Sequence, residues 1–354
     1  MLLIAAVVAV ALTLAFARRI GSIVLATALV AVLVLANLAA GANAYYGTYP
    51  TGRAWLDGTP TAPPPLPSAL PDRGQVVPIT VAPTRSGFGA RQALVYLPPA
   101  WFAQPRPALP VIMLLHDAPG GPVDWIHDGG ADRIADAWAD RHGGVAPVLV
   151  LPDVTGAAGA ARGCVDSPLG GAETYLTADV PAAVQAQFST LPPGRGWAVV
   201  GHSTGGGACA LTLALRHPDL FATFGDFGGL AGPRVGFTNA DTGPTTIALF
   251  GGSAEAFAAH EPEILLTTRP YPGSAGWFQV GGLDAEPLLA ATRLVPIAQT
   301  AGVDTCLVVR PGVGAGPTMW SAAFVDALPW LAARLGLVPE TPELRSACQL
   351  LPAS

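Results

Sequence analysis

The sequence contains no lysine, and its 18 basic residues form no cluster longer than the pair Arg18 and Arg19. The formal net charge is -6 at pH 7, and only 12% of the 354 residues are charged. Nucleic-acid binding needs basic side chains that neutralise phosphates, so we expect no nucleic-acid partner. The chain also lacks metal-ligand spacing and a dinucleotide-binding motif, so we expect neither a metal nor an organic cofactor.

Cysteine is scarce as well, and no C-x-x-C pair occurs. The four cysteines are Cys164, Cys209, Cys306 and Cys348. In an oxidising compartment one or two disulfides could form, and we favour a bond between Cys164 and Cys209. In a reducing compartment the same residues would be buried free thiols.

Apolar residues make up 51% of the sequence and are concentrated at the N-terminus. Residues 2–17 are almost entirely apolar, and an uncharged run over residues 20–40 follows the two arginines. The second run can span a hydrocarbon core of about 30 Å at about 1.5 Å per residue. We therefore predict a transmembrane hairpin or signal anchor over residues 1–44. The competing interpretation is a signal peptide with Arg18 and Arg19 as its basic region and a cleavage site at Ala42-Asn43-Ala44. Each alternative places the domain that follows outside the cytoplasm, and we expect the protein at the cell membrane.

Three further regions follow the apolar segment. Residues 45–74 include the proline-rich run TPTAPPPLPSALP and are predicted to form a linker. Residues 75–337 alternate short apolar runs with longer helix-compatible stretches, which predicts an α/β domain with a mainly parallel sheet flanked by helices. Residues 338–354 form a C-terminal tail.

The expected strands are short and mostly apolar throughout, as in a sheet that is buried on both faces. The expected strands are 75–81, 93–97, 111–115, 148–151, 197–200, 246–250, 276–280 and 305–309, and the expected helices are 131–141, 175–187, 205–216, 287–301 and 319–335.

The strongest chemical motif is Gly201-His202-Ser203-Thr204-Gly205, which lies between an apolar strand and a helix. In a nucleophile elbow of this G-x-S-x-G type, the serine occupies a strained turn and the glycines allow strand and helix to approach closely. The turn places the serine hydroxyl at a helix N-terminus, where the helix dipole favours developing negative charge. We therefore predict Ser203 as the nucleophile and His202 as a structural residue.

Acyl transfer at a serine also needs backbone amides that stabilise an oxyanion. One normally belongs to the residue after the nucleophile, here Thr204, and the other to a loop after an earlier strand. The loop after residues 111–115 supplies Asp117 or Ala118 as the second predicted donor. His116 in the same loop is predicted to be structural.

At these positions the chain resembles the Putative esterase family, which includes esterase D and the mycobacterial antigen 85 mycolyltransferases. The resemblance covers about residues 75–336. The blocks that carry it are Leu114-Leu115-His116 with Asp124-Trp125, Val150 to Asp153, Cys164 to Pro181, the elbow, Arg216 to Phe221, Gly281 to Asp284, Ala301 to Val303, and Asp326 to Leu331. The resemblance implies an α/β-hydrolase fold and a serine esterase or acyltransferase activity on acyl esters or glycolipids of an actinobacterial cell envelope.

The resemblance also implies a catalytic acid after the penultimate strand and a histidine after the last strand. Asp284 matches the acid, with Glu255 as a weaker alternative. Alignment on Trp320 places the family histidine at Ala315, and no histidine follows His260 anywhere in the chain. Loss of this base removes the group that accepts the serine proton.

Three hypotheses remain open for the missing base. His260 could reach the site from a loop at the carboxyl edge of the sheet. Alternatively, slow turnover could use water or substrate as the proton acceptor. Finally, the domain could be a catalytically decayed hydrolase that binds a lipid or glycan of the envelope.

Overall fold

The computed structural model describes residues 29–38, 70–156, 163–168 and 170–342. The chain divides into two compact units, Met1–Tyr46 and Gly47–Ser354. The described part of the first unit is a helix over residues 29–38. No helix in the described ranges combines the length and the apolar character that a membrane crossing requires. The rest of the predicted hairpin or anchor lies outside the described residues.

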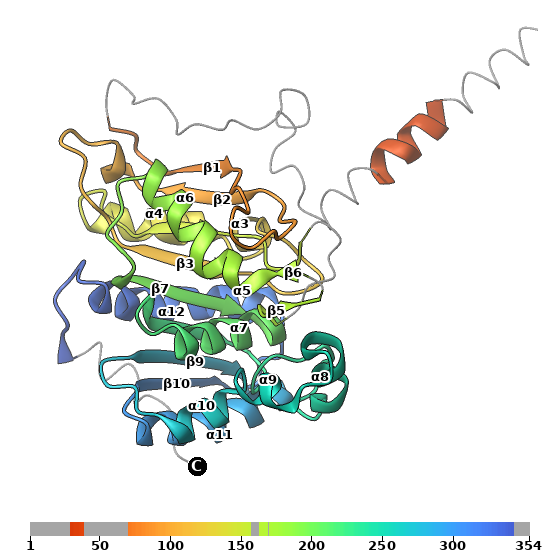
Figure 1. Ribbon diagram of the computed structural model, residues 1–354. Helices are drawn as coiled ribbons and strands as arrows, with labels where there is room; N and C mark the ends of the chain where they lie inside the picture. The colour runs from red at the N-terminus through yellow and green to blue at the C-terminus, as the bar shows by residue number, and fades with distance from the viewer. Residues whose placement is uncertain (1–28, 39–69, 157–162, 169, 343–354) are drawn as a thin grey trace, which may run out of the picture. The chain divides into compact units, whose positions relative to one another are not determined.

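The second unit is built around one eight-stranded sheet with the strand order β1-β2-β4-β3-β7-β8-β9-β10 (Figure 1). β1 and β2 pair antiparallel, β2 pairs antiparallel with β4, and all remaining neighbours are parallel. The strands are β1 (Gln75–Ile79), β2 (Ala93–Leu97), β3 (Val111–Leu115), β4 (Val148–Leu151), β7 (Gly194–His202), β8 (Phe221–Phe227), β9 (Ala275–Gly281) and β10 (Asp304–Arg310). A separate pair consists of β5 (Asp166–Ser167) and β6 (Gly170–Gly171).

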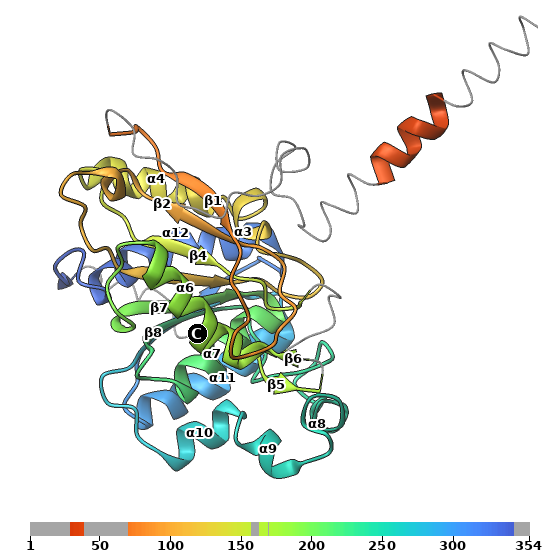
Figure 2. The same ribbon diagram turned by 45° about the horizontal axis from the view of Figure 1, so that its top comes forward.

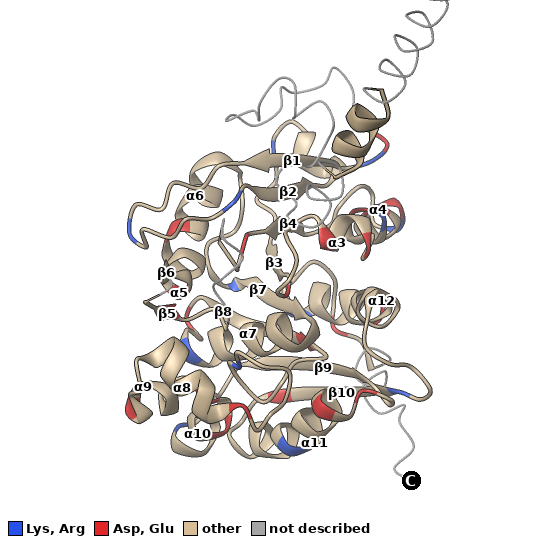
Figure 3. Ribbon diagram, turned by 90° about the vertical axis from the view of Figure 1, so that its right-hand side faces the viewer, with Lys and Arg blue, Asp and Glu red and all other residues tan. Residues whose placement is uncertain are grey.

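Helices cover both faces of this sheet, so that the strands are buried on both sides (Figures 2 and 3). One face packs against α6 (Val180–Gln187), α7 (Ser203–Arg216), α10 (Pro262–Thr268) and α11 (Ala285–Thr300). The other face packs against α3 (Asp124–His127), α4 (Ala131–Arg141) and α12 (Pro317–Arg334). The other helices of the second unit's described residues are η1 (Pro99–Phe102), α5 (Ala172–Thr174), η2 (Tyr175–Asp179), α8 (Thr242–Phe250) and α9 (Ala254–Ala258).

The predicted α/β fold class is confirmed, but one predicted strand is wrong. Residues 246–250 belong to α8, which buries Leu249 and leaves the side chain of Ile247 72% exposed. The sheet position between β7 and β9 is instead occupied by β8, which contains Gly225 and Asp226. These residues weaken the strand signal in the sequence, whereas TIALF has a strong one. Packing in the centre of the sheet overrides that local preference.

A disulfide joins Cys164 to Cys209 across 45 residues of chain, which confirms the favoured pairing. Cys209 is buried in α7, while Cys164 belongs to the segment before β5. Cys306 in β10 is also disulfide-bonded. The first bond therefore ties the segment before β5 directly to the helix that follows Ser203.

Replacing both Cys164 and Cys209 with serine should lower the free energy of unfolding by about 4 kcal/mol, because a 45-residue loop is no longer closed in the unfolded chain. Guanidinium unfolding of wild type and double variant under oxidising conditions measures this loss. Wild type under reducing conditions serves as a comparison, because the reductant also breaks the disulfide at Cys306. Equal midpoints under oxidising conditions would contradict the expectation.

Candidate active site

Ser203 lies at the junction of a strand and a helix: β7 ends at His202, and α7 begins at Ser203. Its φ angle is 64°, and among the described residues only Cys164 shares a positive φ without being glycine. A left-handed conformation is strained for a residue with a side chain and persists only where the surroundings enforce it. The structure therefore shows the sharp strand-to-helix turn that the G-x-S-x-G motif predicts.

Both glycines of the motif lie in close contacts, Gly201 with backbone and Gly205 with a side chain. A Cβ on Gly201 would lie 1.8 Å from the carbonyl oxygen of Gly206, so no other residue fits between β7 and α7. A Cβ on Gly205 would lie 2.2 Å from Oδ1 of Asp117. The first turn of α7 thus packs against both the preceding strand and the loop after β3.

The predicted oxyanion residues lie together. β3 and β7 are neighbouring parallel strands with Leu115 paired to Gly201, so the loop after β3 meets the first turn of α7. Asp117, Ala118, Thr204 and Gly205 line one narrow pocket at this edge of the sheet. The arrangement is the one expected for two chain segments that supply amides to one oxygen atom.

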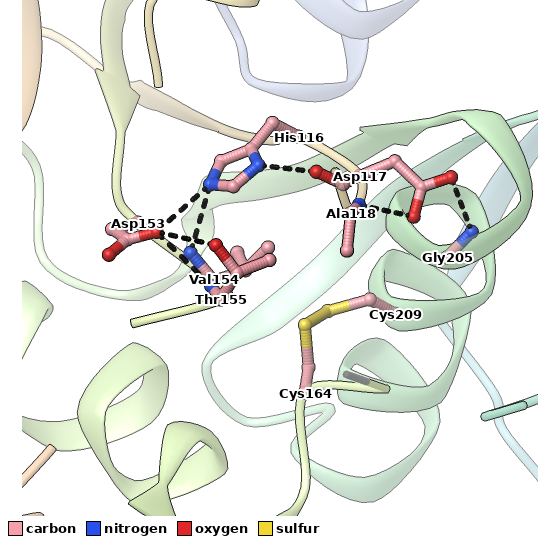
Figure 4. The surroundings of a disulfide bond; sticks show 9 residues. All are labelled: His116, Asp117, Ala118, Asp153, Val154, Thr155, Cys164, Gly205 and Cys209. Atoms are coloured by element: carbon pink, nitrogen blue, oxygen red, sulfur yellow. Dashed lines mark hydrogen bonds and ion pairs between the residues drawn. A yellow bond between two sulfur atoms is a disulfide. The ribbon is translucent and has the colours of Figure 1, made fainter. Parts of the chain in front are cut away.

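The side chain of Asp117 changes this arrangement in a way that the sequence did not reveal. Its Oδ1 accepts a hydrogen bond from the Ala118 amide at 2.7 Å (Figure 4). Its Oδ2 accepts bonds from the Gly205 amide and the Thr204 hydroxyl, each at 3.1 Å. The predicted donor Ala118 therefore already has an acceptor within the protein.

A buried network holds the backbone of the same loop. His116 Nδ1 donates to the carbonyl oxygen of Asp117 at 2.8 Å, and its Nε2 lies 3.2 Å from Asp153 Oδ1. Arg91 Nη2 donates to Asp153 Oδ1 and to the carbonyl oxygen of Gly120, both at 2.7 Å. Burial alone would raise the pKa of Asp153, but the bonds with His116 and Arg91 hold that pKa far below its usual range. His116 has the structural position that the sequence predicted.

Asp284 follows β9 at the start of α11, and burial raises the pKa of its carboxyl. The structure gives its side chain no hydrogen bond with another described residue. The adjacent Leu283 amide donates to the carbonyl oxygen of Val313 at 2.9 Å, which joins this loop to the loop after β10. Ala315, the family histidine position, is exposed two residues farther along. The two loops that would carry an acid and a base therefore adjoin.

His260 does not reach the nucleophile, so its predicted role as the alternative base is wrong. Its Nε2 lies 3.0 Å from Glu173 Oε2, and Glu173 Oε1 accepts from Arg216 Nε at 2.7 Å. Arg216 is the last residue of α7, whose 14 residues extend roughly 20 Å from Ser203. His260 thus lies at the far end of the helix. The weaker acid candidate, Glu255, is exposed on α9.

His202 is buried and its ring stacks on Trp320, with centroids 4.1 Å apart and planes inclined by 13°. Neither ring nitrogen has a hydrogen-bond partner, and burial lowers the pKa of His202 to about 3. The imidazole is therefore neutral at physiological pH and serves as part of the core, as the sequence predicted.

All six histidines lie within the described residues, and none forms a hydrogen bond with Ser203 or Asp284. His142 stacks on Trp138 with centroids 3.8 Å apart, and His217 lies 2.7 Å from Glu173. His127 is exposed on α3. The described residues therefore contain no imidazole in position to accept the serine proton.

Asp226 is a buried acid that the sequence analysis missed, because the strand that carries it was not predicted. It pairs with Gly201 in the sheet and accepts a hydrogen bond from the Gly229 amide at 2.7 Å. A Cβ on Gly207 would lie 2.3 Å from Asp226 Oδ1, so the carboxyl packs against α7. Burial raises its pKa to about 7, which keeps the group largely protonated below neutral pH.

The mostly parallel sheet and the strained serine between β7 and α7 define the α/β-hydrolase class of proteins. Residues 89–333 match the sequence profile of the family described as Putative esterase. The chain belongs to this family, which confirms the resemblance seen in the sequence. Family and fold together support an ester hydrolase or acyltransferase activity.

Two relatives illustrate the range of similarity. An uncharacterized protein of Corynebacterium glutamicum is 33% identical over 344 residues, which cover 90% of this chain and 78% of the relative. The Diacylglycerol acyltransferase/mycolyltransferase Ag85A of Mycobacterium leprae is 40% identical over 87 residues, which cover 25% of this chain and 24% of the relative. The match thus spans about a quarter of the mycolyltransferase.

Solved structures share the fold at low sequence identity. An S-formylglutathione hydrolase from Agrobacterium tumefaciens has a TM-score of 0.62 at 18% identity, covering 75% of this chain and 97% of that chain. A ferulic acid esterase has a TM-score of 0.61 at 18% identity, covering 74% and 99%. MPT51 (FbpC1) of Mycobacterium tuberculosis has a TM-score of 0.51 at 19% identity, covering 69% and 94%.

The raised pKa of Asp226 predicts a pH-dependent stability. Between the ordinary carboxyl value of 3.8 and about 7, the unfolded chain loses this proton while the folded chain keeps it, so stability falls as pH rises. The free energy of unfolding of wild type should fall by roughly 3 kcal/mol between about pH 4.5 and about pH 8, and Asp226→Asn should not show this decrease. Urea unfolding at the two pH values measures both free energies. Asp219→Asn, an exposed acid, is the control, and an unchanged fall in Asp226→Asn would refute the assignment.

Proposed function

We propose that this protein is a serine esterase or acyltransferase that acts on acyl esters or glycolipids of the cell envelope through a Ser203 acyl-enzyme. The observation that carries the proposal is the conformation of Ser203 between β7 and α7, with a φ of 64°. Strain of this kind at a helix N-terminus is characteristic of an exposed nucleophile and brings no evident advantage to folding.

The chemistry would follow the usual course of acyl transfer. The Ser203 oxygen attacks the ester carbonyl and its proton passes, through water or the substrate, to the departing alkoxide, which leaves as the alcohol. Water or a sugar hydroxyl then attacks the acyl-enzyme, gives its own proton back to the Ser203 oxygen and releases the acyl group. Amides of the first turn of α7 and of the loop after β3 would stabilise the tetrahedral oxyanion. Asp284 would supply the acid of the site, whereas the position of the proton acceptor is taken by Ala315.

Two observations favour an envelope substrate. The N-terminal apolar segment, residues 1–44, is long enough for a membrane anchor and would hold an extracytoplasmic domain close to lipids. Part of the chain is similar to a protein named Diacylglycerol acyltransferase/mycolyltransferase.

A second candidate function is binding without turnover. The histidine that the family uses is absent, and each histidine of the chain is held away from the serine by other contacts or exposed elsewhere. A decayed hydrolase would keep the pocket and lose the activated nucleophile. The two functions differ in whether the Ser203 oxygen reacts covalently.

A fluorophosphonate probe separates the candidates, because it reacts with activated serine hydroxyls. An esterase should show labelling of the full-length protein that disappears in Ser203→Ala. His260→Ala should label like wild type, since that ring is bound to Glu173 at the far end of α7. Mass spectrometry of the labelled peptide identifies the modified residue. Complete absence of labelling in wild type would favour the binding function.

Restoring the histidine provides a second prediction. Ala315→His should accelerate labelling at least about tenfold, because general-base catalysis typically contributes about 10² or more. The position is exposed, so the larger side chain can be accommodated. Combining it with Asp284→Asn should cancel most of the gain if Asp284 orients the new imidazole. A double variant as fast as Ala315→His alone would exclude Asp284 from that role.

A further inference from the structure

A carboxylate of the protein itself lies beside the predicted oxyanion site and binds one of its predicted amide donors, that of Ala118. The two oxygens of Asp117 accept bonds from the Ala118 amide at 2.7 Å and from the Gly205 amide at 3.1 Å. One amide belongs to the loop after β3 and the other to the first turn of α7, the two segments that were expected to form the oxyanion site (Figure 4). The carboxylate thus takes the same kind of donors that a tetrahedral intermediate would need.

The chemical match between the two anions is close. A carboxylate and a tetrahedral oxyanion both carry negative charge on oxygen, and both are stabilised by backbone amides and by the positive end of a helix dipole. Thr204 adds a third donor through its hydroxyl at 3.1 Å. An ester carbonyl is neutral before attack and is therefore a weaker acceptor than the carboxylate already in place.

The fit around this carboxylate is tight. A Cβ on Gly205 would stand 2.2 Å from Asp117 Oδ1, so the absence of a side chain at Gly205 makes room for the acid. The backbone on the other side is fixed, because His116 holds the Asp117 carbonyl and Arg91 holds the Gly120 carbonyl. The Ala118 and Gly205 amides can therefore bind another acceptor only if the Asp117 side chain rotates away while the loop stays in position.

We propose that Asp117 is a self-inhibitory residue, whose carboxylate binds the predicted oxyanion donor Ala118 and the neighbouring Gly205 amide and restrains the reactivity of Ser203 toward simple esters. The self-inhibitory role rests on the proposed acyl-transfer function. The binding of the Asp117 carboxylate to the two amides is independent of that function. Removing the carboxylate leaves the donors of Ala118 and Gly205 free for an external anion. A small carboxylate such as acetate should then bind where the side chain was.

The test compares wild type, Asp117→Ala and Asp219→Ala as full-length proteins in detergent. Asp219 is an exposed acid before β8, so its removal matches the change in charge without touching the site. Acetate at about ten times its Kd should raise the melting temperature of Asp117→Ala by about 2 to 4 °C relative to the same concentration of chloride. Wild type and Asp219→Ala should show no such rise.

The second readout is the rate of fluorophosphonate labelling. Asp117→Ala should label at least about tenfold faster than wild type, in keeping with the effect of an oxyanion donor, and acetate should slow the variant alone. Asp117→Asn keeps an acceptor oxygen without charge and should give an intermediate rate, which also guards against misfolding of the alanine variant.

The outcomes separate the two proposals. Acetate stabilisation of Asp117→Ala without any labelling would reject the esterase function and retain the internal anion. Equal effects of acetate on wild type and Asp117→Ala would overturn the internal anion, whatever the labelling rate. Slower labelling of Asp117→Ala than of wild type would likewise overturn the self-inhibitory role.

Discussion

The close approach of α7 to β7 is the constraint on which the site depends. Gly201 and Gly206 bring strand and helix so near that any Cβ at Gly201 would overlap a carbonyl oxygen. That contact fixes the turn at Ser203, and the turn sets the serine into its left-handed conformation with φ of 64°. Because β3 is the neighbouring strand, the same geometry brings the loop with Asp117 against the first turn of α7. The pocket then follows from backbone packing.

Three carboxyl groups at the carboxyl edge of the sheet have different electrostatic settings. Asp117 is bonded to amides at the start of α7, Asp226 is buried with a pKa of about 7, and Asp284 has a raised pKa without a described partner. The guanidinium of Arg91 binds Asp153 and the carbonyl oxygen of Gly120 in the loop after β3. A site so arranged can hold a hydroxyl nucleophile, but it offers no neutral imidazole to activate it.

Much of the fold could be predicted from apolar runs alone. Strands such as β3 and β4 are buried on both faces, so their sequences are continuous stretches of Val, Leu, Ile and Met that need no tertiary information to recognise. β8 could not be recognised, because Gly225 and Asp226 interrupt its pattern, and α8 resembled a strand. Both errors arise where position in the sheet outweighs local preference.

The sequence by itself determined the nucleophile elbow, the position of Asp284 after a strand and the absence of a histidine after His260, and it favoured a disulfide between Cys164 and Cys209 that the structure then showed. These are local or pairwise features that the order of residues carries directly. Only the tertiary structure decided where His260 lies and what the Asp117 side chain does. Both depend on which segments meet in space, because a side chain's hydrogen bonds are set by neighbours that are distant in the chain. His260 is 87 residues from Glu173, and Asp117 is 88 residues from Gly205.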